Sequence, residues 1–372
     1  MPVDMARTAI YCAATGDDVI YEGSRLWCAT VETAKEKLRE HGVAVLLNVL
    51  DPEGVKKMQD GMWDTLGWMS QNMETPIVRG DPKTYATARE FAPNHGALFQ
   101  GWRGLAHRQH IWDAREAAAP AFAEIWGCAP EELLCSFDAT SMGIVHLAEP
   151  SSTGWERGNV WLHVDQSPTR PEFECVQSWI SGEDVEAGDA TLRVMPGTHL
   201  QMREFAEHFG ITETKDWYKL TAEERAWFAE QGYEDIRIMA PAGSLVLWDS
   251  RLVHSGAAPL REAQNQKPRN VVYVCMQPRH VTVRGMDQGI EKRRLTTKEM
   301  KTLETTLKKR RAIFDPTNDS RFLRMTTHWP RKVLLFGTFP RSYGPKPESW
   351  SKVPTGEMPK LTSLQRRLAG LD

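Results

Sequence analysis

The sequence has no apolar run that approaches the roughly 20 residues needed to cross a bilayer. Its first residues, MPVDMARTAIYCAATGDD, contain three aspartates and no long apolar stretch, so they make a poor secretory signal. The net charge of −3 gives no electrostatic argument for a nucleic-acid or membrane partner. Internal repeats and low-complexity tracts are also missing. We therefore expect a cytoplasmic globular protein without a membrane span.

The six cysteines form no C-x-x-C pair, and most lie in apolar surroundings. We interpret them as buried, reduced thiols of a cytosolic protein. The composition, with 26% charged and 41% hydrophobic residues, is that of an ordinary globular protein. At 372 residues the chain is long enough to bury a sizeable core, and most of its 14 tryptophans are expected in that core or in a pocket wall.

Several helix signals occur in the first third of the chain. Asp51 is placed to cap the start of one predicted helix. Gly42 and Gly127 are placed to end two others, the second of which covers 107–127. The stretch 73–104 is rich in Pro, Gly and polar residues. We predict a long irregular segment there, of the kind that often covers a site.

From residue 132 the chain contains short β-branched or apolar runs, each closed by Gly, Pro or Asp. Regular helices do not alternate with these runs. The pattern predicts an antiparallel double-sheet barrel, mainly β with flanking helices, and not a parallel sheet. A helical insertion is expected near 204–231.

A basic helix is predicted near the C-terminus. Thr296 and Glu299 form a capping box, and an apolar stripe follows at Met300, Leu303 and Leu307. The adjacent KKRR, 308–311, can contact phosphates. A solvated helix end, which favours positive charge, is the preferred interpretation.

The stretch WLHVDQS, 161–167, places His163 and Asp165 two residues apart. On a strand, such residues point to the same side, so the pair can supply two ligands to one metal ion. A mononuclear, oxygen-activating iron site needs two neutral imidazoles and one carboxylate on one face of the metal, with the opposite face open. Taken alone, however, the two residues are better explained as a hydrogen-bonded surface pair.

His254 is the candidate for the third ligand. It follows the apolar run of GSLVLWDSRLVHSG and precedes a Ser-Gly turn, where a strand leaves the mouth of a barrel. Fifteen residues later, Arg269 begins another strand-like run. A guanidinium there can hold the distal carboxylate of a dicarboxylic cosubstrate in a two-pronged contact that lysine cannot match. The alternatives are a buried structural His254 and an ion pair of Arg269 with an acid such as Glu262.

This order of His-x-Asp, a gap of about ninety residues, His and then Arg resembles the phytanoyl-CoA dioxygenase-like branch of the Fe(II)/2-oxoglutarate-dependent oxygenases. HGVAVLLNVLDPEGVKKM is similar to the family's N-terminal strand and helix. ATLRVMPGTHL resembles the strand and turn that lie between the family's two iron-binding histidines. GSLVLWDSRLVHSG resembles the segment that precedes the family's second histidine. These pieces lie in family order between Thr33 and Arg279.

The resemblance implies that His163, Asp165 and His254 ligate Fe(II) and that Arg269 binds 2-oxoglutarate. The family's arginine usually lies nearer the second histidine, which makes Arg261 a rival. Because Arg261 lies in a polar connecting loop whereas Arg269 begins a strand, we prefer Arg269.

Other residues near the motif receive weaker assignments. Gln177 can face the pocket as a cofactor contact, or it is a plain barrel-lining residue. Trp161 and Trp248 are expected to pack rather than to contact substrate. His199, in PGTH, is interpreted as a turn residue and not as a ligand. Three further histidines are expected to be structural: His107, His110 and His146.

The fold implied by the resemblance is a double-stranded β-helix, that is, a jelly-roll or cupin-like core with helices on its outer face. This domain is expected to cover 31–280, including the helical insertion. An N-terminal extension, 1–30, precedes it. A helical or irregular C-terminal extension, 281–372, is expected to pack on the core.

The activity implied is oxidation of an unactivated C–H bond of a small molecule, with O2 and 2-oxoglutarate consumed and succinate and CO2 released. Halogenating relatives carry a small residue in place of the carboxylate, so Asp165 favours hydroxylation, desaturation or oxidative cyclisation, as in natural-product biosynthesis. The substrate stays open, and a monomer is favoured. The alternatives are a cupin-type metal-dependent hydrolase or isomerase, a non-catalytic binding module and a nucleic-acid-base oxygenase. The near-neutral charge disfavours the last.

Overall fold

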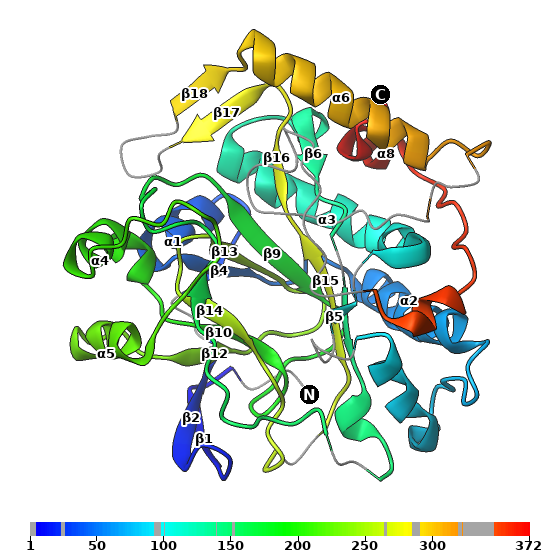
Figure 1. Cartoon of the computed structure of the whole chain (residues 1–372), viewed down its shortest axis with the longest axis horizontal. Helices are drawn as coiled ribbons and strands as arrows, with labels where there is room; N and C mark the ends of the chain where they lie inside the picture. The colour runs from blue at the N-terminus through cyan, green and yellow to red at the C-terminus, as the bar shows by residue number, and fades with distance from the viewer. Residues whose placement is uncertain are drawn as a thin grey trace.

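Two seven-stranded β-sheets form the centre of the computed structural model (Figure 1). The structure describes residues 5–23, 27–92, 98–99, 101–138, 140–150, 153–263, 266–284, 291–318, 322 and 346–372. In spatial order, sheet A contains β1 (Thr8–Cys12), β2 (Asp17–Glu22), β12 (Ile236–Ile238), β10 (Thr191–Val194), β14 (His254–Ala257), β8 (His163–Val164) and β11 (Tyr218–Lys219). Sheet B contains β3 (Cys28–Ala29), β4 (Val43–Leu46), β13 (Leu245–Asp249), β9 (Val176–Ser181), β15 (Arg269–Val274), β7 (Thr140–Gly143) and β5 (Leu98–Phe99).

The strand pairing is mixed. Most neighbouring strands are antiparallel, as predicted, but β12 pairs with β2 and β3 pairs with β4 in parallel. The expectation of purely antiparallel sheets was therefore wrong at these two places. Both parallel pairs add an N-terminal strand to a core strand. A long connection separates β2 from β12, and such connections leave the relative direction of two strands free, whereas a hairpin forces it.

The two sheets pack face to face through an apolar core. Trp179 and Val246 of sheet B and Val194 and Ile236 of sheet A belong to one buried cluster. On a strand, alternate residues share a face, so the same side of sheet A that carries Val194 also carries His254, its cross-strand partner. The inner faces of the sheets therefore hold both the core and the histidine predicted to bind metal.

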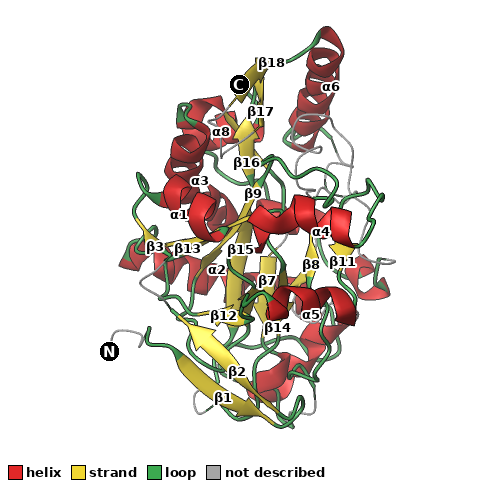
Figure 2. Ribbon diagram, turned by 90° about the vertical axis from the view of Figure 1, so that its left-hand side faces the viewer, coloured by secondary structure: helices red, strands yellow, loops and turns green. Residues whose placement is uncertain are grey.

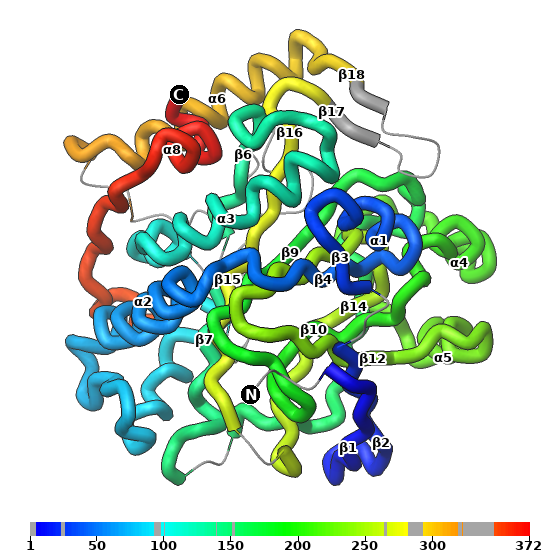
Figure 3. The backbone as a smooth tube through the Cα atoms, turned by 180° about the vertical axis from the view of Figure 1, so that it is seen from behind, coloured from blue at the N-terminus to red at the C-terminus, as the bar shows by residue number. Residues whose placement is uncertain are grey.

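Three helices cover the outer face of sheet B, as the view from behind shows (Figure 3): α1 (Ala34–His41), α2 (Pro52–Ser70) and α3 (Gln109–Trp126). Leu38, Met58 and Phe122 of these helices join Leu247 and Val272 of the sheet in one buried cluster. Alternate strand residues thus face two different apolar layers, one between the sheets and one under the helices.

The predicted helix signals operate as expected in α1, α2 and α3. The Asp51 side chain accepts a hydrogen bond of 2.7 Å from the Gly54 backbone N–H at the start of α2. Gly42 and Gly127 end α1 and α3 in the left-handed conformation that glycine adopts without steric cost. The stretch 73–104 is less irregular than predicted because it contains a 3-10 helix, η1 (Pro82–Glu90).

The remaining elements lie around the two sheets (Figure 2). Two small antiparallel pairs consist of β6 (Leu133–Cys135) with β16 (Met276–Pro278), and β17 (Val281–Arg284) with β18 (Glu291–Arg294). In the described residues, the other α-helices are α4 (Met202–His208) and α5 (Ala222–Glu230), both inside 204–231 or at its border, α6 (Thr297–Ile313) and α8 (Ser363–Ala369). Further 3-10 turns are η2 (Trp102–His107), η3 (Pro130–Glu132), η4 (Val145–Leu147), η5 (Thr198–Gln201) and η6 (Glu348–Ser351).

The basic helix α6 confirms some sequence predictions and corrects others. Its capping box at Thr296 and Glu299 is present, and Leu303 is buried. Met300, predicted in the apolar stripe, is exposed. Arg310, predicted at a solvated helix end, is buried over the Phe137 ring at 4.1 Å and donates to the carbonyl of Ala369. Helix α8 returns to this end of α6, which is why the KKRR segment is not wholly in solvent.

Two expectations from composition can be compared with the described part of the chain. None of the helices there is both long and apolar enough to span a membrane. All six cysteines are free thiols, but Cys28 and Cys128 are half-buried rather than fully buried.

Candidate metal centre

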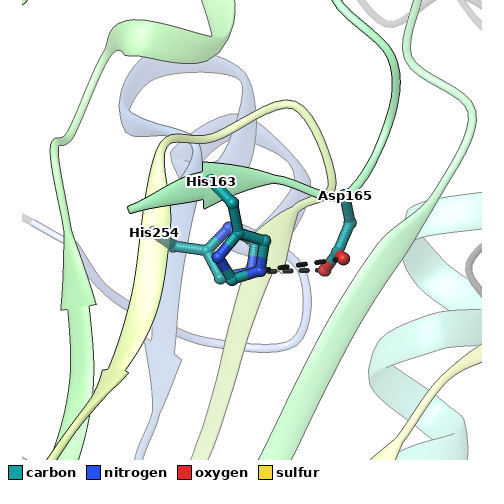
Figure 4. A group of neighbouring side chains, drawn as sticks. All are labelled: His163, Asp165 and His254. Carbon is teal, nitrogen blue, oxygen red and sulfur yellow. Dashed lines mark ion pairs between the residues drawn. The ribbon is translucent and has the colours of Figure 1, made fainter. Parts of the chain in front are cut away.

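The side chains of His163, Asp165 and His254 lie close together and point toward one another (Figure 4). His163 begins β8 and His254 begins β14, and the two residues are direct cross-strand partners in the antiparallel pair. Asp165 follows β8, two residues after His163. Because opposite residues of an antiparallel pair point to the same side, the strand register alone brings both imidazoles together.

The distances within the triad suit a shared metal ion. One ligand atom from each of the three residues lies within 4.8 Å of the others. His254 Nε2 is 3.3 Å from Asp165 Oδ2, and His163 Nε2 is 3.8 Å from Asp165 Oδ1. Ligands about 2.1 Å from one ion and at right angles to each other are about 3 Å apart. Within the described residues, this is the only such group of three metal-ligating side chains.

Backbone carbonyls fix the orientation of both imidazoles. His163 Nδ1 lies 3.2 Å from the Trp161 carbonyl, and His254 Nδ1 lies 2.8 Å from the Leu252 carbonyl. A carbonyl only accepts, so each Nδ1 carries the proton and donates it. The Nε2 lone pair of each ring is then directed at the common centre, which is the arrangement that metal-binding histidines use.

The Asp165 carboxylate is held from sheet B. Gln177 of β9 donates from Nε2 to Asp165 Oδ2 at 2.7 Å, and the same Nε2 lies 3.2 Å from Ser250 Oγ. The Asp165 backbone N–H donates to the Ser250 carbonyl at 3.0 Å. These contacts make Gln177 a positioning residue for the carboxylate. Its predicted contact with a cofactor stays a prediction.

Burial and mutual contact set the charges of the triad. Burial and the charge of His254 lower the pKa of His163 to about 4, so this imidazole is neutral near pH 7. Burial by itself raises the pKa of Asp165, but contact with the two imidazoles, His254 first, and the hydrogen bond from Gln177 lower it below its usual value. A neutral His163 and an ionised Asp165 are the protonation states in which these groups bind a metal.

The two candidate arginines have different surroundings. Arg269, at the start of β15, is half-buried and donates from Nε to Ser141 Oγ at 3.1 Å and from Nη1 to the Ala190 carbonyl at 2.7 Å. Its guanidinium also lies 5.9 Å from the Trp179 ring centre. Arg261 is exposed and lies over the Trp155 ring. Arg269 is thus the arginine held between the sheets.

The structure also places the residues that received weaker assignments. Trp248 is buried in the core between the sheets, as expected. Trp161 packs on the His163 imidazole with ring centres 4.9 Å apart, but 41% of it is exposed. His199 is buried and lies 3.1 Å from the Arg39 carbonyl, away from the triad. The three other histidines are likewise outside the triad: His107, His110 and His146.

Sequence reasoning missed three residues of the site. Ser250 and Ser141 orient Gln177 and Arg269, and a lone serine in a strand-rich stretch carries no signal for such a role. Trp217 lies against His163, with ring centres 5.7 Å apart, and comes from the stretch interpreted only as a helical insertion. An aromatic residue beside Asp216 and Lys215 is too common a pattern to have identified it.

Comparison with known proteins identifies the family. The model of the family described as phytanoyl-CoA dioxygenase (PhyH) matches residues 38–262, which is more than half of the chain. The chain belongs to the phytanoyl-CoA dioxygenase family. As a member with the His-x-Asp and distant His triad in place, it is an Fe(II)/2-oxoglutarate-dependent dioxygenase, with iron and 2-oxoglutarate as its cofactors. These predictions from sequence are confirmed.

Relatives of this phytanoyl-CoA dioxygenase family member include one curated protein, the Ava biosynthesis cluster protein O of Aspergillus versicolor. It is 26% identical over 256 residues, covering 66% of this chain and 77% of the relative. Among solved structures, the carbocyclase SnoK from nogalamycin biosynthesis matches with a TM-score of 0.42 at 15% identity, covering 70% of this chain and 91% of SnoK. AviO1 from Streptomyces viridochromogenes Tue57 matches with a TM-score of 0.40 at 16% identity, covering 67% of this chain and 96% of AviO1.

Proposed function

We propose that His163, Asp165 and His254 together bind one Fe(II) ion and leave the opposite face of the metal open. The observation that carries this proposal is the convergence of two Nε2 atoms, each with its Nδ1 proton held by a backbone carbonyl, on one ionised carboxylate. Two neutral imidazoles and one carboxylate are the donor set of the non-haem iron oxygenases. The side chains present therefore fit the metal that the family uses.

Arg269 is proposed to bind the distal carboxylate of 2-oxoglutarate. Its bonds to Ser141 and Ala190 fix the plane of the guanidinium, which prepares it for a two-pronged contact with a carboxylate. The half-buried position strengthens such a contact relative to one in open water. Arg261 is exposed, so it lacks this burial.

The proposed reaction is oxidation of an unactivated C–H bond in a small-molecule substrate. Iron bound at the triad, with 2-oxoglutarate and O2, supplies the oxidising power for hydrogen removal, and succinate and CO2 are released. The protein's own residues position the ligands and exclude water from the site. Gln177 holds the Asp165 carboxylate, and the triad side chains are almost fully buried. The relative named for a biosynthesis cluster supports a natural-product substrate. Hydroxylation, desaturation and ring closure are all compatible with this site.

We also propose that the two sheets form a double-stranded β-helix. Core strands alternate between sheets along the chain, β7 in B, β8 in A, β9 in B and β10 in A, and later β13 in B, β14 in A and β15 in B. This alternation winds the chain into a jelly roll, with the metal centre at one end of it. The domain then covers 31–280, with 281–372 as an extension.

The decisive test is anaerobic binding of Fe(II) and 2-oxoglutarate. The wild-type protein is expected to take up one equivalent of Fe(II) and, with 2-oxoglutarate, to develop a visible charge-transfer absorption. The variant His254→Ala should lose both signals. The matched control His208→Ala, at an exposed histidine of α4, should keep both. Absence of stoichiometric Fe(II) uptake by the folded wild type, or full uptake by His254→Ala, would contradict the assignment.

A further inference from the structure

Two exposed tryptophans border the metal centre. Trp161 is 41% exposed and Trp217 is 45% exposed, although indole rings are normally among the most buried groups. Trp161 stacks on the His163 imidazole with ring centres 4.9 Å apart and planes 12° apart. Trp217 contacts the same imidazole at 5.7 Å with planes tilted by 40°. Both rings thus touch a metal-binding residue and also reach solvent.

The strand register places Trp161 on the inner side of sheet A. Trp161 precedes His163 by two residues, so it shares a face with it, and continuing the pairing of β8 with β14 sets Trp161 opposite Gly256. A Cβ added at Gly256 would lie 3.5 Å from Trp161 Cζ2 and would meet no other atom within 4 Å. Gly256 is exposed although Ser255 and Ala257 beside it are buried. Open space therefore borders the Trp161 ring two residues from His254.

The backbone at Trp217 is held in an unfavourable conformation. Its φ of +67° lies in the left-handed region, which bulky side chains avoid. The Trp217 N–H donates to the Asp165 carbonyl at 2.8 Å, and β11 begins at the next residue. An ion pair of Arg170 with Asp216 fixes the preceding residue. The surrounding contacts thus keep an exposed indole next to the metal centre despite the strain.

We propose that Trp161 and Trp217 bind the substrate through a planar, unsaturated ring system. This inference rests on the proposed function and specifies the substrate class of the same site. Large apolar ring faces in contact with solvent gain most from a flat apolar partner, and offset-stacked or edge-to-face aromatic pairs gain more than the area they bury accounts for. Neither indole carries a formal charge, so a neutral planar ring needs no charged partner there. The reactive carbon of the substrate then lies on or beside its planar ring.

The test uses protein loaded anaerobically with Fe(II) and 2-oxoglutarate, and 2-naphthol as the probe, with decahydro-2-naphthol as its saturated counterpart. Binding is measured by equilibrium dialysis. We expect the wild type to prefer 2-naphthol. Trp161→Ala and Trp217→Gly should each weaken 2-naphthol binding by about two- to tenfold, whereas Trp161→Phe and Trp217→Phe should retain most of it. Glycine is used at Trp217 because it tolerates the positive φ.

The controls separate this inference from the proposed function. Tyr11→Ala removes an exposed aromatic ring of β1, outside the metal centre, and should leave 2-naphthol binding unchanged. All tryptophan variants should still take up one Fe(II) and bind 2-oxoglutarate, because neither indole is a ligand. Equal binding of the planar and saturated probes by the wild type, or unchanged 2-naphthol affinity in both Trp161→Ala and Trp217→Gly, would overturn the inference while leaving the iron site intact. Loss of Fe(II) uptake in both variants would instead show that the rings only support His163.

Discussion

Replacement of Arg269 by glutamine should abolish tight binding of 2-oxoglutarate without disturbing the iron. Arg269 starts β15 and donates to Ser141 Oγ and to the Ala190 carbonyl, so its guanidinium is fixed by atoms other than those of the triad. Glutamine removes the positive charge and shortens the side chain. The distal carboxylate of 2-oxoglutarate then enters a half-buried site without a counter-ion.

The structure sets the size of the effect. Removing one partner of a buried, hydrogen-bonded charge pair costs about 2–5 kcal/mol. Because Arg269 is half-buried rather than fully buried, we expect a loss of about 3 kcal/mol in the binding free energy of 2-oxoglutarate, which is roughly a hundredfold loss of affinity. Arg269→Lys keeps the charge but loses the planar fork, so about a tenfold loss is expected. Loss of two hydrogen bonds should also lower the free energy of unfolding by about 1–2 kcal/mol.

The assay is succinate release as a function of 2-oxoglutarate concentration, with Fe(II) binding measured in parallel. Arg269→Gln should raise the KM for 2-oxoglutarate about a hundredfold and leave Fe(II) stoichiometry at the wild-type value. Arg261→Gln is the matched control, since Arg261 is exposed over Trp155, and it should behave as the wild type. A KM for Arg269→Gln within twofold of the wild type would refute the assignment. A large effect of Arg261→Gln would transfer the role to that residue.

Three further predictions concern the carboxylates and the metal. Gln177→Leu removes the donor to Asp165 Oδ2 and should weaken Fe(II) binding at least about tenfold in an anaerobic titration; unchanged affinity would show that the contact is dispensable. Burial raises the pKa of Asp189 to about 7, so its stabilising contribution is fully present below about pH 4 and is lost as the pH rises through about 7. Between pH 5 and pH 8 the free energy of unfolding of the wild type, measured with urea, should therefore fall by about 2 kcal/mol more than that of Asp189→Asn. Parallel pH profiles of the two unfolding free energies would contradict this. Finally, Fe(II) at a hundred times its Kd should stabilise the wild type by about 2.7 kcal/mol, seen as a raised thermal midpoint, and an equal shift in His254→Ala would argue against the triad.

The parts of the fold that depend on neighbouring residues could be predicted from the sequence. Asp51 caps α2, Gly42 and Gly127 end α1 and α3, and the capping box of α6 forms, because each signal acts within one helical turn. The triad could be predicted for a related reason. His163 and Asp165 are two residues apart, and His254 follows an apolar strand that has to pair with its neighbours.

Features that depend on distant segments could not be predicted in the same way. Arg310 carries the sequence signature of a solvated helix end, yet it is buried because α8 and Phe137 pack against it. The parallel pairing of β2 with β12 joins residues more than two hundred positions apart. Trp217 illustrates the same limit at the site, since its position against His163 results from the pairing of β11 with β8 and from a strained backbone.

Asp165 links the two sheets at the metal centre. The two histidines belong to sheet A, where β8 and β14 pair, whereas the donor to the Asp165 carboxylate, Gln177, belongs to β9 of sheet B. The position of the third ligand, Asp165, therefore depends on how the two sheets pack and not only on the pairing of β8 with β14. A sandwich whose core shifts by a fraction of an ångström would move the carboxylate relative to both imidazoles, because packed interiors transmit such strain. The dense apolar cluster between the sheets, which includes Trp179 next to Gln177 on the same face of β9, thus acts on the geometry of the iron site as well as on stability.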